Sequence, residues 1–176
     1  MGLLSLHESN LHPMKIWLLL LLVASTSSAQ PLWPHNQKTG YIEFKGTLPW
    51  PAQTKTSSQR EALLQRWYQT KLLDSMQIES ASPRTLNRLL RTYGSVTARG
   101  HLKYQRQAHL YQLNYTLKLV PAAKGLVYHV WDFSYAEGEG DASVSFDLES
   151  AIKDNRADNA VLAMFRRRIM GAITRW

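Results

Sequence analysis

Three consecutive segments in the second half of the chain alternate apolar and polar side chains. They are residues 95–104, 111–119 and 126–135, and stretches of turn-forming residues at 106–108 and 121–125 separate them. A period of two is typical of strands with one buried face, and short connections join antiparallel neighbours. We therefore predict an antiparallel meander of three strands that has one apolar face and one polar face.

Two other segments repeat apolar residues at steps of three and four, which predicts amphipathic helices. The first helix is expected at residues 58–73, where Ser58 and Glu61 have the spacing of a capping box. The second is expected at residues 156–174, with arginines late in the helix, where the helix dipole favours positive charge. Its apolar stripe consists of Leu162, Phe165, Ile169 and Ile173.

Three shorter segments complete the expected order of elements. Residues 41–48 alternate like a half-buried strand, which ends at Pro49 and Pro51 because proline cannot donate to a strand ladder. Residues 80–93 fit a helix and a strand equally well, and both interpretations stay open. Residues 137–141 are expected to form an acidic loop, followed by a short strand or an extended lead into the last helix.

Together these elements predict the α+β class, with one antiparallel sheet of four to six strands and two main helices packed on one face of that sheet. The helical stripes should pack on the apolar sheet face, because each element is apolar on one side only. The residues expected to meet in this core are Leu64, Trp67, Leu162, Phe165 and Ile169 from the helices and Tyr111, Leu113, Tyr115 and Leu117 from the sheet.

The longest apolar run, residues 16–24, has the features of an export signal. Lys15 precedes it, and small residues follow it, with Ser27 and Ala29 at positions −3 and −1 of a cleavage site. The run is too short for a transmembrane helix, which needs about 20 apolar residues. We expect translation to start at Met14 and the product to be periplasmic or secreted after cleavage at Ala29. The expected organisation is a signal peptide at 1–29, an extended leader at 30–40 and a single α+β domain at 41–176.

The composition of the chain excludes several classes of function. The chain has no cysteine and a formal net charge of +8. The absence of cysteine excludes thiol catalysis, cysteine-ligated zinc and a lipid-modified cysteine after the signal, so we expect a soluble, cleaved product. In an exported protein the positive charge favours an anionic lipid or polysaccharide surface, or simple solvation, over nucleic acid. We therefore expect no nucleic-acid partner and no membrane span.

No motif in the chain indicates a reaction. There is no Gly-x-Ser-x-Gly elbow, and the acidic loop begins like a calcium loop but has Ala142 where that loop needs glycine. His101, His109 and His129 could bind zinc only if they shared one face and one level of the sheet. We accordingly expect no catalytic residue, no cofactor and no metal site.

The polar face of the predicted meander is the leading candidate for a partner-binding surface. We predict an exported, non-enzymatic binding or structural module that uses this face, or a sheet edge, for a homo-oligomer or an anionic surface. A small-ligand carrier is the second interpretation, with a pocket between the last helix and the sheet lined by Trp131 and Tyr135, and a hydrolase without a recognisable motif is the third. The candidate face consists of Arg99, Lys103, Gln112, Asn114, Thr116 and Lys118, with Lys45 alongside.

The order of strand, helix, long meander and final helix behind an export signal resembles a family of exported Bacteroidota proteins. That family is a domain of unknown function with a TATA-binding-protein-like fold. The resemblance implies this fold and an exported location over residues 39–176, and it brings no catalytic residues. Residues 80–93 and 137–146 are where the chain departs from the pattern. The matching stretches are residues 39–44, 64–68, 93–100, 113–119 and 125–133.

Overall fold

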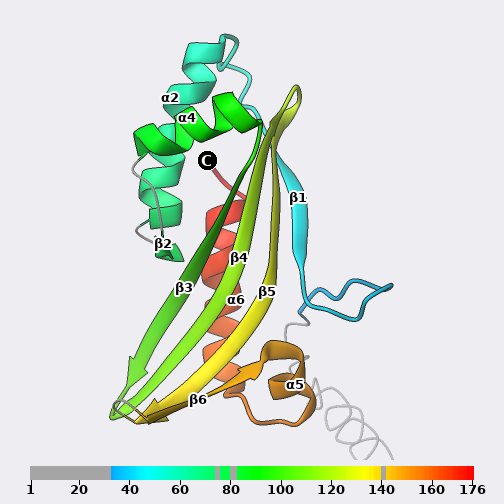
Figure 1. Ribbon diagram of the computed structural model, residues 1–176, viewed down its shortest axis with the longest axis vertical. Helices are drawn as coiled ribbons and strands as arrows, with labels where there is room; N and C mark the ends of the chain where they lie inside the picture. Colours follow the sequence, from blue (N-terminus) through cyan, green and yellow to red (C-terminus); the bar gives the residue numbers. More distant parts are fainter. Residues whose placement is uncertain (1–32, 74–75, 80–82, 140–141) are drawn as a thin grey trace, which may run out of the picture. The chain divides into compact units, whose positions relative to one another are not determined.

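The alternating segments form the centre of an antiparallel sheet in the computed structural model, which describes residues 33–73, 76–79, 83–139 and 142–176 (Figure 1). Within the described residues the sheet has six strands in the order β1-β5-β4-β3-β2, and β6 also pairs with β5. The predicted meander is confirmed as β3, β4 and β5. The strands are β1 (Phe44–Pro49), β2 (Ile78–Glu79), β3 (Val96–Arg106), β4 (His109–Ala122), β5 (Gly125–Glu139) and β6 (Ala142–Asp147).

The helices confirm the α+β class and correct several boundaries. The first predicted helix continues in its last six residues as a π-helix, and the open segment is a helix over its described residues 83–93. The final helix begins three residues later than expected, because Asp158 caps it by accepting from the backbone N–H groups of Ala160 and Val161. The helices are α2 (Ser57–Trp67), η1 (Tyr68–Leu73), α4 (Pro83–Tyr93), α5 (Leu148–Lys153) and α6 (Asn159–Ile173).

The capping box of α2 lies two residues before the predicted one. Thr56 accepts a hydrogen bond from the backbone N–H of Gln59, and the Gln59 side chain accepts from the backbone N–H of Thr56. Both the Thr-x-x-Gln and the Ser-x-x-Glu spacing satisfy the motif. Glu61 is used elsewhere, since its carboxylate pairs with Arg91 on α4.

Replacing Thr56 by alanine is expected to lower the free energy of unfolding by about 1 kcal/mol, because the first turn of α2 loses its side-chain acceptor. Ser58→Ala is the matched control, since Ser58 lies inside the helix and is exposed, and it should change stability by less than about 0.5 kcal/mol. Urea unfolding followed by circular dichroism measures both. Equal effects of the two substitutions would contradict the observed cap.

The core lies between the sheet and α6, which runs along one sheet face (Figure 1). Every residue of the predicted helical stripes and of the predicted sheet face is buried. Trp67 joins α2 to this layer, because its indole N–H donates to the carbonyl oxygens of Ala172 at 2.9 Å and Arg175 at 3.0 Å. The predicted residues of both helical stripes and of the apolar sheet face therefore share one buried core.

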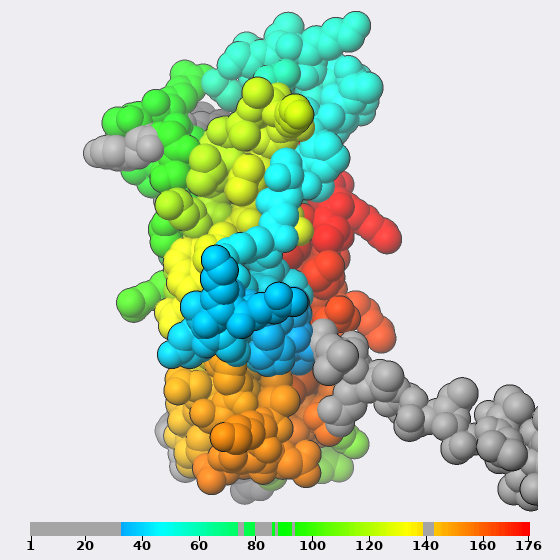
Figure 2. All heavy atoms as spheres, turned by 90° about the vertical axis from the view of Figure 1, so that its right-hand side faces the viewer, coloured from blue at the N-terminus to red at the C-terminus, as the bar shows by residue number. Residues whose placement is uncertain are grey.

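The segment before β1 belongs to the domain rather than to an extended leader. Trp33 is 6 % exposed, and its ring packs edge-on against Phe44 and Phe133 with centroid distances of 5.7 Å to each. Figure 2 shows this segment (blue) lying beside β5 (yellow) and next to the β6–α5 region (orange). Trp33 thus contributes to the core, and Trp33–Trp176 form one compact unit. The predicted signal peptide, its start at Met14 and residues 30–32 lie outside the described residues.

The acidic loop predicted at residues 137–141 is also wrong for its described part. Residues 137–139 are the end of β5, and β6 pairs with them in antiparallel register. Of the two continuations left open after the loop, the short strand is therefore confirmed. Residues 140 and 141 lie outside the described residues.

Candidate functional site

The strand register brings the six predicted face residues together on one side of the sheet. Lys103 lies opposite Gln112, and Arg99 lies opposite Thr116. Asn114 and Lys118 alternate with buried residues of β4 in the same phase. Of the helices, α6 lies behind the opposite face of the sheet (Figure 1). The geometry of the predicted face is therefore as expected, and Lys45 of β1 lies opposite His129, which in turn lies opposite Lys118.

A β-bulge interrupts this face at the centre of β5. Asn114 pairs with Ser134 and Thr116 pairs with Trp131, so two residues of β5 stand opposite Tyr115 alone. The extra residue is Asp132, which has a positive φ of 60°. Asp132 accepts a hydrogen bond from the Thr116 hydroxyl at 3.1 Å, and aspartate tolerates the left-handed conformation better than most residues. Bulges often re-aim side chains next to functional sites.

The bulge coincides with a gap in the pairing of β5. On the edge away from β4, β1 pairs with β5 as far as Val130, and β6 pairs with it from Ser134 onward. Two cavities, of about 330 and 440 Å³, meet at this gap and share Asp132, Phe133 and Asp147. We call them together the bulge groove. Its further lining residues are Glu79, Arg99, Gly100, Asn114, Tyr115, Thr116 and Ser134 in the first cavity, and Asn36, Thr39, Tyr41, Glu43, Trp131 and Glu149 in the second.

The charge of the bulge groove is opposite in sign to that of the chain. Five carboxylates line it, and Arg99 is the cation among the lining residues, whereas the whole chain has a formal charge of +8. Asp147 lies in both cavities, and although it precedes α5 its side chain makes no capping hydrogen bond. The carboxylates are those of Glu43, Glu79, Asp132, Asp147 and Glu149.

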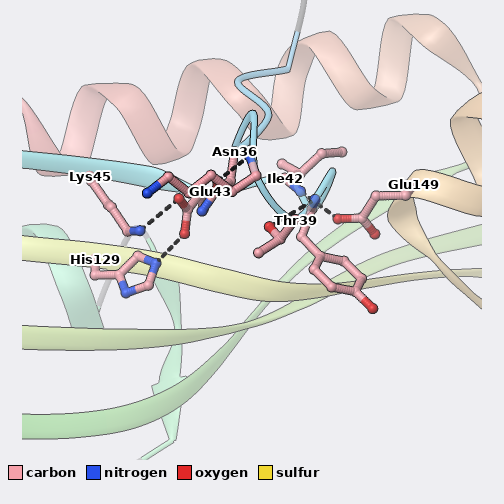
Figure 3. Close-up of polar contacts among 9 residues, drawn as sticks. Asn36, Thr39, Ile42, Glu43, Lys45, His129 and Glu149 are labelled. Atoms are coloured by element: carbon pink, nitrogen blue, oxygen red, sulfur yellow. Dashed lines mark hydrogen bonds and ion pairs between the residues drawn. The ribbon is translucent and has the colours of Figure 1, made fainter.

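Two of these carboxylates connect the groove to the segment before β1. Glu149 accepts a hydrogen bond from the backbone N–H of Ile42 at 2.6 Å. Glu43 accepts from Lys45 at 2.7 Å and lies 2.8 Å from Nε2 of His129, so that both side chains converge on one carboxylate (Figure 3). Burial alone would raise the pKa of Glu43, but the hydrogen bonds and charges of Lys45 and His129 outweigh it and hold the pKa below its ordinary value.

Replacing Glu43 by glutamine is expected to remove a pH-dependent part of the stability. Since the pKa of Glu43 is lowered in the folded protein, the ionised carboxylate stabilises the fold above the pKa of the unfolded chain, and this contribution is lost as the pH falls through the folded value. Urea unfolding should therefore show a wild-type advantage over E43Q at neutral pH that shrinks in acid. The matched control is E79Q, at a carboxylate that is 63 % exposed. A wild-type advantage that stays constant at every pH would contradict the expectation.

The three histidines lie at different levels of the sheet, His101 opposite Asn114, His109 opposite Arg106 and His129 opposite Lys118. His101 lies beside Glu79, with 3.2 Å between Nδ1 and the carboxylate, and His129 contacts Glu43. Among residues 33–73, 76–79, 83–139 and 142–176, no group of three histidine or acidic side chains could hold a metal ion.

The pocket predicted for a small-ligand carrier is wrong as placed. Trp131 lies opposite Thr116 on the polar side of the sheet, whereas Tyr135 lies opposite the buried Leu113. Tyr135 is fully buried, and its hydroxyl donates to Glu137 and accepts from the backbone N–H of Asp158. The bulge reverses the alternation of β5 between the two residues, so they cannot line one pocket between α6 and the sheet.

Sequence reasoning did not identify the acidic residues of the bulge groove. A signal for the bulge is present in the sequence, because the apolar positions of β5 change from the even-numbered Leu126 and Val130 to the odd-numbered Phe133 and Tyr135, all four of which are buried. That change from even to odd positions requires one extra residue between Val130 and Phe133. The β-bulge could thus have been located next to Asp132 from the sequence.

Comparisons with the profiles of known protein families, with curated proteins and with solved structures give no match for this chain. Within the described residues, no helix is long and apolar enough to cross a membrane.

Proposed function

We propose that the protein is an exported, non-enzymatic binding module whose bulge groove takes up a cationic group of its ligand or partner. The observation that carries the proposal is the local charge of the groove, five carboxylates against one guanidinium in a chain of formal charge +8. Complementary charge gives a binding surface its specificity and raises its association rate. The net charge alone predicts an anionic partner. Such a partner suits the rest of the surface but not the bulge groove.

Aromatic side chains support a cationic ligand. Tyr41 is 67 % exposed and Trp131 is partly exposed, and both line the second cavity. The Trp131 ring stacks on His129 with a centroid distance of 4.3 Å, which holds the indole in place. A cation near an aromatic ring is attracted by the electron-rich ring face, and the carboxylates add charge-assisted hydrogen bonds. An alkylammonium or guanidinium group can make both the contact with an aromatic ring and the hydrogen bonds with the carboxylates.

The other parts of the proposal rest on the sequence. Export is proposed from the signal pattern at residues 14–29, and the TATA-binding-protein-like family resemblance stays a proposal of the same kind. Self-association is compatible with the same groove, because a second copy could supply the cation. A carrier would need a different site from the one predicted for it, and no site was predicted for a hydrolase.

Titration calorimetry with an end-blocked tetralysine peptide tests the proposal, with tetraglutamate as the opposite-charge probe. We expect saturable binding of tetralysine, with affinity reduced about 3- to 10-fold in D132N and in D147N, since each removes one carboxylate from the groove. D154N is the matched control, because Asp154 is exposed, pairs with Arg156 and lies outside the groove.

Three outcomes would overturn the proposal. They are binding of tetraglutamate in preference to tetralysine, absence of saturable tetralysine binding, and equal affinity of D147N and D154N. The thermal unfolding of each variant is measured as well, so that a loss of binding is interpreted only for variants that are folded. Sedimentation velocity of the free protein and of D147N shows whether a second copy occupies the groove.

A further inference from the structure

A second cavity, of about 370 Å³, lies where α2 and α4 face the turn between β4 and β5. It shares no lining residue with the bulge groove, and we call it the helical cleft. One part of its lining is apolar and the other part is charged. The lining residues are Trp50, Leu64, Leu90, Pro121, Ala122 and Ala123, with Ser57, Arg60, Glu61 and Arg91.

The apolar part of the helical cleft is pre-formed. Leu64 and Leu90 are 4 % and 7 % exposed and belong to the core. The Trp50 indole is held from two sides, because its N–H donates to the Ala122 carbonyl at 2.9 Å and its ring stacks on Trp176 at a centroid distance of 5.0 Å. A ligand therefore meets an ordered apolar wall and does not have to pay for ordering it.

The charged part of the cleft has one cation in excess. Arg91 is paired with Glu61, with 3.0 Å between Nε and the carboxylate. Arg60 lies with its guanidinium carbon 5.7 Å from the centroid of the Trp50 ring, and its Nε donates to the Thr54 carbonyl at 3.3 Å. Among the described residues its two terminal nitrogens have no hydrogen-bond acceptor. An anion can thus bind Arg60 without breaking an existing ion pair.

We propose that the helical cleft binds a small amphiphilic anion, an acyl or aryl carboxylate whose apolar body lies against Trp50 and the two leucines while its carboxylate pairs with Arg60. The volume is within the range of small-molecule sites, and a guanidinium is well suited to a carboxylate. A free small molecule fits better than a lipid surface, because Leu64 and Leu90 are buried and do not protrude from the surface. This proposal is independent of the one for the bulge groove.

Titration calorimetry of the full chain with decanoate tests the proposal, with decanol as the uncharged probe. We expect saturable decanoate binding below about 1 mM and an affinity at least about tenfold lower in R60Q, since a charge-assisted pair is lost. R66Q is the matched control, because Arg66 lies on the same helix, is exposed and does not line the cleft. A123W, at the exposed turn that bounds the cleft, should abolish binding by filling the space.

Three outcomes would show that decanoate does not bind in the helical cleft through Arg60. Equal affinity of R60Q and R66Q for decanoate, decanol binding as tight as decanoate binding, or association with anionic vesicles without binding of free decanoate would each overturn the proposal. If A123W lowers the midpoint of thermal unfolding, the comparison of R60Q with R66Q still tests the proposal. D147N, which concerns the bulge groove, should leave decanoate binding unchanged.

Discussion

Replacing Trp67 by alanine is expected to lower the free energy of unfolding by about 3–5 kcal/mol, the range found when a buried aromatic side chain is truncated. Trp67 is 1 % exposed. Its indole N–H is the donor for two carbonyl oxygens near the end of α6, and its ring packs edge-on against Trp176 at 5.8 Å. The substitution therefore removes packing and two hydrogen bonds at the junction of α2 with α6. Urea unfolding followed by circular dichroism measures the loss.

Two further variants separate the causes of this loss. Trp67→Phe keeps a ring but leaves the carbonyl oxygens of Ala172 and Arg175 without this donor, and should cost about 1–3 kcal/mol. Tyr41→Ala removes an aromatic side chain that is 67 % exposed and should change stability by less than about 0.5 kcal/mol. An effect of W67A no larger than that of Y41A would show that the junction does not stabilise the domain.

Gly100→Ala is expected to cost about 2–4 kcal/mol, although it adds a single methyl group. A Cβ at Gly100 would lie 2.5 Å from the hydroxyl oxygen and 2.6 Å from Cζ of Tyr115, which is its direct cross-strand partner. The Tyr115 ring cannot move easily, because it is 2 % exposed and its hydroxyl donates to the Met76 carbonyl. The cost of overpacking and the cost of disturbing the hydrogen bond from Tyr115 to Met76 add to each other.

A double-mutant cycle tests whether the ring causes the loss. In a Tyr115→Leu background the cost of G100A should fall to about 1 kcal/mol or less, because the atoms that the methyl group meets are gone. Gly171→Ala is the control, since a Cβ there meets nothing within 4 Å and the residue lies in α6. It should be neutral or stabilise the domain by up to about 1 kcal/mol. Full additivity of G100A and Y115L would contradict the expected clash.

The parts of the fold that the sequence predicted are those with long, regular patterns. Alternation over residues 95–135 identified β3, β4 and β5, and the stripe of α6 identified its buried face. Short elements were missed or misplaced for local reasons. α5 has six residues, too few for a periodic pattern, and the acidic end of β5 is a strand because β6 pairs with it, which composition does not reveal.

The candidate site was predictable only in part. The polar face follows from alternation along β3 and β4, and the six residues expected there do share a face. The bulge groove does not follow, because its carboxylates come from four separate places in the chain and meet only through long-range pairing. Glu43 and His129 are 86 residues apart, and Ile42 and Glu149 are 107 apart. Their proximity depends on a register that local patterns do not contain.

The place of β1 at the edge of β5 has a consequence for the order of folding. β3, β4, β5 and β6 are sequential neighbours and form through hairpins, whereas β1 must close a loop of more than 70 residues to reach β5. We therefore expect β1 to dock late, and the wall of the bulge groove that contains Glu43 to be the last part completed. A ligand of the groove would then slow unfolding of the finished domain without accelerating its formation.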